Sequence, residues 1–262
     1  MGEPVVSSWQ AFENEIRQWQ KAGEVPSLWW RDDDANQDHP ALQRLLSIAK
    51  IHRLPLSLAV IPHQAGKDLV HCFRNAPVTV LQHGYQHTNH APPGKKKQEL
   101  GLHRPLSIIV EELQQGKNHL QALFSAQFVP CLVPPWNRIT DILLPHLFSL
   151  GFTGISTYGS LFFRMPRSGL RQVNTHIDIL DFKAGRCFRG REYCLDLMVR
   201  HLKARREGEV DRLQCTGLLT HHLAHDDGCW SFCEELFERL AFRDRVQWRS
   251  VVDLLPEKQV VD

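Results

Sequence analysis

The sequence lacks the features that mark membrane, secreted or repetitive proteins. No part of its 262 residues approaches the roughly 18 uninterrupted apolar residues that a membrane span needs. The first 20 residues are polar and partly acidic, without the basic start and apolar run of a secretion signal. Internal repeats and low-complexity linkers are also missing. We therefore expect a cytoplasmic protein that does not insert into a membrane.

The chain also has little excess charge and no paired cysteine motif. Its net charge of +2 is too small to favour a nucleic-acid or anionic-membrane partner. The lysine run 95–97 is short and typical of a solvated loop, although it could also contact an anionic group on a substrate. The seven cysteines form no C-x-x-C pair, so buried reduced thiols are favoured over disulfides or a thiolate metal site. We expect no nucleic-acid partner, and nothing indicates the oligomeric state.

What the sequence does contain is an alternation of short apolar runs and longer amphipathic segments. Apolar residues make up 42% of the chain, enough for a sizeable core. Strands are expected at 27–30, 55–61, 78–81, 128–133, 152–156, 216–220 and 246–248, with a further one at 177–182. Helices are expected at 40–51, 107–123, 141–150, 191–205 and 230–242.

This alternation predicts an α/β fold in which crossover helices connect parallel strands. About seven such units fit a closed or nearly closed (β/α) barrel with outer helices. We expect one domain over residues 1–262 with its core at about 27–255, and a doubly wound open sheet is the alternative. In both architectures ligands bind at the carboxyl ends of the strands, which is where the polar clusters of this chain lie.

Two of these clusters contain metal-ligating side chains. His83 and His87 follow a predicted strand with the four-residue spacing that lets two imidazoles share a metal ion, and Gly84 between them permits an unusual backbone angle. Three adjacent carboxylates, residues 32–34, follow another strand and repel each other unless a cation or partner neutralises them. Two histidines and one carboxylate would leave open positions on a metal, as in a catalytic site.

Two further clusters follow the predicted strands. Pro134, Pro135, Trp136 and Asn137 would form a stiff, partly apolar wall. His221 and His222 follow the strand at 216–220 and would bring an imidazole to the same end of the barrel.

The order of these clusters resembles the polysaccharide deacetylase family, also called carbohydrate esterase family 4 or the NodB homology domain. Asp33 and Asp34 match its Asp-Asp motif, and residues 83–87 match His-[Ser/Thr]-x-x-His with Gly84 as a departure. Residues 133–136 match its Arg-x-Pro-[Tyr/Trp] segment except that Val133 replaces the arginine, and residues 219–221 match Leu-x-His. Asp178 is a poor match to the remaining Asp segment. The resemblance spans roughly residues 28–225 and implies a divergent member with a distorted (β/α) barrel.

The resemblance also implies roles for individual residues. Asp34, His83 and His87 would hold one divalent metal ion, for which zinc is expected and manganese, cobalt or nickel are alternatives. Asp33 would be the general base and His221 the general acid. A shift of one residue in the acidic run would make Asp32 and Asp33 the pair instead of Asp33 and Asp34. The same kind of shift would replace His221 by His222.

Further residues are expected to bind substrate: Arg31, Tyr85, Pro135, Trp136, Asn137 and His222. A backbone N–H near Tyr85 would help the metal to hold the developing oxyanion. In the family the arginine at the position of Val133 tethers the base. Because Val133 replaces this arginine, the role of Asp178 is also open. Arg31 is the candidate to replace the missing arginine.

The function implied is a hydrolase that acts on a carbon–nitrogen bond of a non-peptide amide. It would remove an acetyl or other acyl group from an N-acylated sugar or a related small amide by means of a metal-activated water. A cyclic-amide hydrolase on the same fold is one alternative, and a non-catalytic protein that binds metal or glycan is another. The substrate is a small molecule or carbohydrate that the sequence does not identify.

Overall fold

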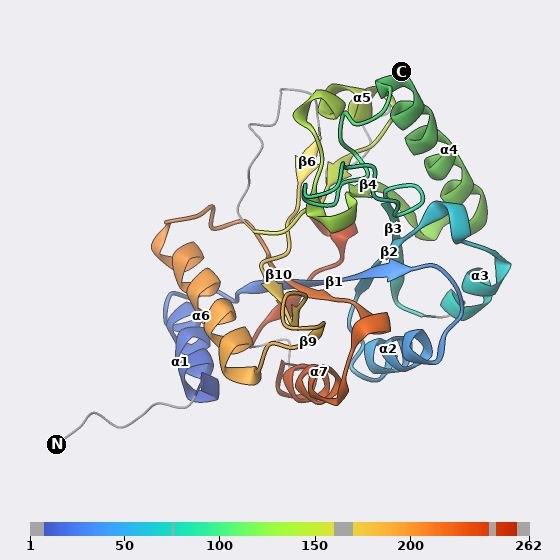
Figure 1. Ribbon diagram of the computed structural model, residues 1–262. Coiled ribbons are helices and arrows are strands. Elements are labelled where there is room, and N and C mark those ends of the chain that lie inside the picture. Colours follow the sequence, from blue (N-terminus) through green and yellow to red (C-terminus); the bar gives the residue numbers. More distant parts are fainter. Residues whose placement is uncertain (1–7, 75, 160–169, 241–244, 256–262) are drawn as a thin grey trace.

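Five long strands form the centre of a parallel sheet, and each contains an apolar run of the sequence. The computed structural model describes residues 8–74, 76–159, 170–240 and 245–255. In spatial order the central strands are β4 (Phe128–Val133), β3 (Val78–His83), β2 (Leu56–Val60), β1 (Ser27–Ala35) and β10 (Thr216–Thr220). All pair in parallel, so their carboxyl ends lie together (Figure 1).

Short strands extend this sheet on both sides. Residues 171–179 close the sheet into a barrel, because they form backbone hydrogen bonds with residues 153–157 on one side and with β10 on the other. The amides of Arg171, Val173 and Thr175 donate to the carbonyls of residues 153, 155 and 157, whereas those of His176 and Ile179 donate to residues 217 and 219. The elements concerned are β5 (Gly154–Ile155), β6 (Arg171–Gln172), β7 (Ile177–Asp178) and β11 (Gln247–Trp248), which pairs with the start of β1.

The barrel is therefore irregular, with seven strand positions if residues 171–179 are taken as one. This confirms the predicted distorted (β/α) barrel of about seven parallel strands with outer helices. A separate antiparallel hairpin, β8 (Leu180–Asp181) with β9 (Cys187–Phe188), follows directly on β7.

Helices pack around the outside of the sheet (Figure 1). They are α1 (Ser8–Lys21), α2 (Pro40–Ile51), α3 (Lys67–Phe73), α4 (Leu106–Phe124), α5 (Leu144–Ser149), α6 (Arg191–Glu207) and α7 (Asp227–Leu240). Pro40 occupies the first turn of α2, where its missing N–H costs nothing, and the His39 side chain accepts a hydrogen bond from Ala41 N. Within the described ranges, every helix is too short or too polar to cross a membrane.

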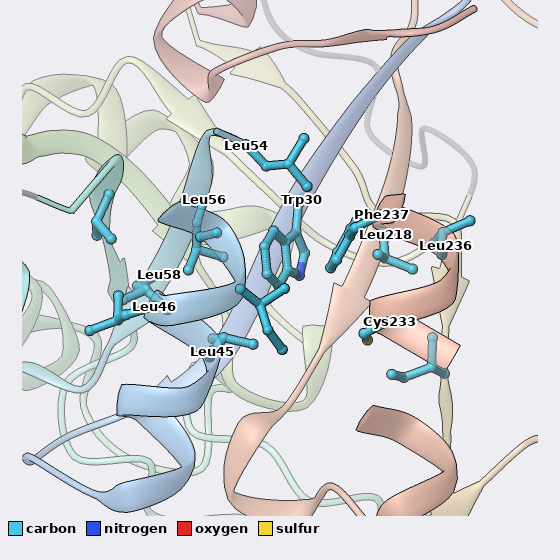
Figure 2. Packing of buried hydrophobic residues seen from close by; sticks show 14 of the residues in the cluster. Trp30, Leu45, Leu46, Leu54, Leu56, Leu58, Leu218, Cys233, Leu236 and Phe237 are labelled. Atoms are coloured by element: carbon cyan, nitrogen blue, oxygen red, sulfur yellow. The ribbon is translucent and has the colours of Figure 1, made fainter. Parts of the chain in front are cut away.

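Side chains of β1 alternate between two environments because successive residues of a strand point to opposite faces. Leu28 and Trp30 belong to the large outer core beneath the helices, whereas Trp29 belongs to a smaller cluster inside the barrel. Figure 2 shows Trp30 packed between leucines of α2 and β2 on one side and Phe237 of α7 on the other. Replacing such a buried tryptophan by alanine typically costs about 3–5 kcal/mol. The same alternation decides where the next residues of β1 point.

Several predicted elements differ from those observed. Strand β1 does not end at Trp30 but continues through the acidic cluster, because Asp32 still pairs with Thr220 and Ala35 with Val60. The strand expected at 177–182 is split into β7 and β8 by the turn into the hairpin. The helices α1 and α3 and the strands β6 and β9 were not expected from the sequence, and part of the helix expected at 230–242 lies outside the described residues.

Candidate metal centre and active site

The carboxylate of Asp34 lies where β1 departs from regular pairing. The register between β1 and β2 shifts between Asp32 and Ala35, and Asp34 adopts a left-handed backbone with φ of 71°. Residues other than glycine rarely adopt this conformation, and such strain concentrates at functional sites. The irregularity takes Asp34 out of the strand's alternation and directs its carboxylate to the end of β3.

Both histidines of the predicted pair meet this carboxylate. His83 Nε2 lies 3.0 Å and His87 Nε2 3.3 Å from Asp34 Oδ1. The pair is not on a helix. It flanks a tight turn in which Gly84 and His87 have φ of 57° and 58°. His83 is the last residue of β3, so it points into the barrel, and the turn returns His87 to the same side.

The three side chains fit a divalent metal. Their donor atoms all lie within 4.8 Å of one another. His83 Nδ1 is 3.0 Å from the carbonyl oxygen of Val133, which can only accept a hydrogen bond. One ring proton therefore sits on Nδ1, and Nε2 faces the centre, where it can offer its lone pair to a metal ion that displaces its proton. His83 is buried, but the side chains of His87 and Asp34 are 24% and 31% exposed, which leaves access for water or substrate.

The electrostatics of the three groups are coupled. Burial opposes ionisation of Asp34, but its hydrogen bond to His83 and the nearby histidine charges hold the pKa of this carboxyl well below its usual range. Burial lowers the pKa of His83, but the hydrogen bond to Asp34 and the nearby carboxylate charges raise it more, so the pKa lies above its usual value. Burial and the charge on His83 lower the pKa of His87 to about 4. An ionised carboxylate beside a neutral imidazole is the state that a metal ion requires.

A buried glutamate explains the glycine at position 84. Glu99 is fully buried, and its carboxylate accepts hydrogen bonds from the backbone N–H groups of Tyr85 and Gln86 at 3.2 and 2.8 Å. A Cβ atom at Gly84 would lie 2.0 Å from Glu99 Oε2 and 2.6 Å from Pro135 Cγ. Glu99 thus fills the space beside Gly84 and fixes the turn that carries both histidines.

This finding corrects one predicted role. The N–H of Tyr85 donates to Glu99, so it is not available for an oxyanion. The Tyr85 side chain also points elsewhere, because its hydroxyl donates to Gln115 and its ring lies beside His63. No substrate contact through this side chain is supported.

Asp33 lies inside the barrel, held by an arginine two residues before it in the same strand. Arg31 Nε is 2.9 Å from Asp33 Oδ1, and Arg31 Nη2 donates to Oδ2 at 3.0 Å. Residues i and i+2 of a strand share a face, so Arg31 and Asp33 both point inward with Trp29. The remaining Arg31 donors reach Ser156 Oγ at 2.6 Å and Asn137 Oδ1 at 2.8 Å. Arg31 is fully buried, so it positions Asp33 and does not contact a substrate, contrary to its predicted binding role.

His221 faces Asp33 from the end of β10. Its Nε2 is 4.0 Å from Asp33 Oδ2, and its Nδ1 is 4.0 Å from Asp178 Oδ1. Burial raises the pKa of Asp178, with the charge on His221 acting in the opposite direction. The partly exposed ring of Phe182 packs edge-on against the His221 ring with centroids 4.9 Å apart. Asp178, a poor match in the sequence, thus lies beside the candidate acid.

Asp32 and His222 form a separate pair on the outer side of the sheet. The Asp32 carboxylate contacts His222 Nδ1 and accepts hydrogen bonds from His222 N at 3.0 Å and Thr220 Oγ1 at 2.7 Å. Burial raises the pKa of Asp32, but the charge and hydrogen bond of His222 lower it more, so the pKa lies below its usual value. Both side chains are almost fully buried, so His222 cannot line a substrate site as expected. The pair connects the ends of β1 and β10.

Comparison of the sequence with protein-family models and with curated proteins finds no match. The structure, in contrast, is similar to several solved ones. A protein from Mycobacterium smegmatis, provisionally described as a polysaccharide deacetylase, aligns over 88% of this chain and 89% of its own, with a TM-score of 0.63 and 15% identity. The chain has the fold of the polysaccharide deacetylases.

Two further structures show the range of this deacetylase fold. A peptidoglycan N-acetylglucosamine deacetylase, solved with 4-naphthalen-1-yl-N-oxidanyl-benzamide, aligns over 87% of this chain and 86% of its own with a TM-score of 0.55 and 13% identity. A family 4 pseudoenzyme from Bacillus anthracis aligns over 90% of this chain and 67% of its own with a TM-score of 0.55 and 14% identity. The fold thus occurs in an enzyme and in a pseudoenzyme, so activity has to be argued from the site.

The loop after β4 forms one rim of the site in this deacetylase fold. The Trp136 ring lies 4.4 Å from that of His87, and Trp136 and Asn137 both have positive φ angles of 55° and 56°. Pro135 contacts the turn at Gly84, and Lys97 Nζ lies 5.9 Å from the centre of the Trp136 ring. Trp136 and Pro135 thus lie beside His87 and Gly84, whereas the side chain of Asn137, predicted to bind substrate, accepts a hydrogen bond from Arg31.

Sequence reasoning missed Glu99, Ser156 and Phe182. Glu99 follows a lysine-rich loop and carries no motif, and its burial depends on a turn 13 residues earlier in the chain. Ser156 and Phe182 directly follow the short strands β5 and β8, to which the sequence assigned no role in the site. No local signal in the sequence would have found these three residues.

Proposed function

We propose that this chain is a metal-dependent hydrolase that removes an acyl group from a nitrogen of a small molecule or sugar. The observation that carries the proposal is that Asp34 Oδ1 lies close to the Nε2 atoms of both His83 and His87. Asp33 immediately precedes Asp34 at the end of the same strand. Two imidazoles and one carboxylate leave coordination positions open, which distinguishes a catalytic from a structural site. Metal activation of water is the chemistry that such a site provides.

In this proposal each described side chain has one task. A metal held by Asp34, His83 and His87 would lower the pKa of a bound water toward ~7 and polarise the acyl oxygen. Asp33, oriented by Arg31, accepts the proton of the attacking water. His221, 4.0 Å from Asp33, donates a proton to the leaving nitrogen, and Asp178 orients its imidazole. The products are a small acid and an amine.

The substrate class rests on the rim and on the fold. Trp136 beside His87 offers an aromatic face against which an acyl group or the apolar face of a sugar ring can pack. Structural neighbours include a deacetylase of peptidoglycan N-acetylglucosamine, which supports an N-acetylated sugar as the first substrate to test. Zinc is the metal that this donor set favours, and manganese, cobalt and nickel also accept it.

Metal analysis and turnover together test the proposal. We expect the metal-replete protein to hold about one divalent ion, and His83→Ala and His87→Ala to lose it. His90→Ala is a matched control from the same loop. A wild-type protein that binds no metal would disprove the site.

Turnover is then measured on N-acetylated glucosamine oligomers, acetyl esters and cyclic amides. Asp33→Asn should retain the metal but lower turnover by on the order of 10² or more, as expected for loss of a general base. Hydrolysis of cyclic amides alone would favour the ring-opening alternative. Metal binding without hydrolysis of any substrate would assign the chain to the non-catalytic class.

A further inference from the structure

A cavity lined by described residues lies at the opposite end of the barrel from the metal triad. It has a volume of about 780 Å³ and is bordered by the amino-terminal ends of the strands, among them Ser27 of β1, Arg171 of β6 and Gln247 of β11. None of the residues of the proposed active site lines it. This volume is within the range of ordinary ligand pockets, which is about 300–1,000 Å³.

A buried arginine forms part of the cavity wall. Arg205 of α6 is 2% exposed and donates to the carbonyl oxygens of Ser27 and Arg212 and to the hydroxyls of Ser27 and Thr216. All of these acceptors are neutral. Among the described residues no carboxylate lies within ion-pairing distance of its guanidinium, and its Nε–H has no hydrogen-bond partner.

This positive charge is poorly compensated. Burial lowers the pKa of Arg205 to about 10, and the charges of Asp211 and Glu24 offset this only in part. A buried cation without a counter-ion is costly, so proteins normally pair it. Its aromatic neighbour Trp19, 5.1 Å from the guanidinium, provides only a weaker cation–π contact.

The other charges around the cavity leave the same imbalance. Arg212 pairs with Glu24 at 2.8 Å and Arg249 with Asp253 at 3.5 Å. Arg171 is exposed and forms no ion pair with a described residue. Arg205 and Arg171 are thus the two arginines of the lining without an ion pair to a described residue. The lining also contains the carboxylate of Asp211, neutral amides and apolar residues such as Val173 and Leu254.

We propose that this cavity binds a small organic anion whose carboxylate or phosphate group is held by Arg205 and Arg171 and whose remaining part contacts the apolar wall. Arg171 can bind either kind of oxyanion through paired N–H donors. Arg205 would contribute its Nε–H and its charge, because its Nη1 and Nη2 donors are already bonded to Ser27, Thr216 and Arg212. The two donors come from α6 and β6, which are far apart in the sequence, so the ligand would connect the helix layer to the strand that closes the barrel.

Isothermal titration calorimetry tests this with three probes: inorganic phosphate, benzoate and the uncharged benzamide. We expect at least one anion to bind and benzamide not to bind. Arg171→Ala should weaken the binding about tenfold or more, since a hydrogen bond to a charged group contributes about 1.5–3 kcal/mol. Arg205→Met should abolish it. Arg74→Ala, an exposed arginine on the α3 side of the molecule, is the control and should bind as the wild type does.

His83→Ala separates this cavity from the metal centre, where anions can also bind. Anion binding that survives in His83→Ala and is lost in Arg171→Ala supports the proposal whether or not the chain proves to be a hydrolase. Binding that is lost in His83→Ala but retained in Arg171→Ala would place the anion at the metal and overturn it, as would failure of both anions to bind. If Arg205→Met does not fold, the exposed position of Arg171 keeps the comparison decisive.

Discussion

Arg31 holds the carboxylate of Asp33 at two points from within the same strand. Nη2 donates a hydrogen bond to Oδ2 at 3.0 Å, and Nε lies at the ion-pair distance of 2.9 Å from Oδ1. In the family that the sequence resembles, an arginine at the position of Val133 tethers the base. Val133 is buried inside the barrel here. In the proposed function Arg31 would supply this tether from β1 instead of β4, which answers the main sequence-based objection to an active site.

Removing Arg31 should therefore affect stability strongly. Arg31→Met leaves the buried Asp33 without its counter-ion, and we expect a loss of about 3–5 kcal/mol in the free energy of unfolding. The double variant Arg31→Met/Asp33→Asn should recover part of this loss, because the uncompensated charge is gone. Urea unfolding measures both variants. Arg200→Met breaks the exposed pair with Asp196 and should cost less than about 1 kcal/mol; an equally small effect of Arg31→Met would contradict the tether.

A relocated arginine tests the same relationship through activity. If Arg31 replaces the arginine missing at position 133, Arg31→Met/Val133→Arg should regain part of the turnover that Arg31→Met loses. Metal content should stay near that of the wild type throughout, since Asp34, His83 and His87 are unchanged. Steady-state kinetics on an accepted acylated substrate measure the recovery, with Val133→Arg alone as the control for added bulk. Complete loss of metal in Arg31→Met would show that Arg31 supports the fold of the whole site.

Gly84 and Glu99 provide a second test. A serine at position 84 would place its Cβ 2.0 Å from the buried Glu99 carboxylate and would force a positive φ on a residue that disfavours it. We expect Gly84→Ser to weaken metal affinity by about 10- to 100-fold, the usual range for disturbing the support of metal ligands. Gly94→Ser is the matched control, because Gly94 also has positive φ but no atom within 4 Å of the added Cβ. Equal losses in both variants would mean that backbone strain, not Glu99, is responsible.

Much of the barrel and part of the site follow from local patterns. Apolar runs predicted the central strands, and the order of acidic and histidine clusters predicted which strand ends meet. The register within the acidic run could not be predicted, because Asp32 and Asp33 differ only in the face to which they point. That face is set by the pairing of β1 with its neighbours and by the irregularity before Ala35. The same holds for His221 and His222, which the turn after β10 sends to opposite sides of the sheet.

Asp178 is predicted to act through His221. Asp178→Asn removes the negative charge 4.0 Å from His221 Nδ1, so a protonated imidazole should be less stable and turnover should fall about tenfold or more. The alkaline limb of the pH–rate profile should move to lower pH, a change that a purely structural defect would not produce. Asp181→Asn, an exposed aspartate of the same hairpin, is the control. A lower turnover with an unchanged profile would contradict the assigned role of Asp178.

Metal removal should lower the stability of the folded chain. Binding to Asp34, His83 and His87 requires the folded arrangement of β1 and β3, so a metal at about 100 times its Kd adds about 2.7 kcal/mol to the free energy of unfolding. We expect a chelator to lower the Tm of the wild type and to leave that of His87→Ala unchanged. Differential scanning calorimetry with and without the metal measures the difference. A Tm of the wild type that does not respond to metal would contradict binding at these residues.

A stacked histidine pair should make the chain sensitive to acid. The rings of His176 and His201 lie 3.6 Å apart, and burial lowers the pKa of both, to about 4 for His201. The folded state therefore binds fewer protons than the unfolded chain, whose histidines titrate near pH 6.5. Stability is then full above this pH and falls as the pH drops from about 6.5 to 4, by on the order of 2 kcal/mol for His201. In His201→Gln the free energy of unfolding should depend less on pH in this window, whereas His71→Gln, an exposed histidine, should behave as the wild type. Urea unfolding from pH 4.5 to 8 measures the slope, and a steeper slope in His201→Gln would refute the assignment.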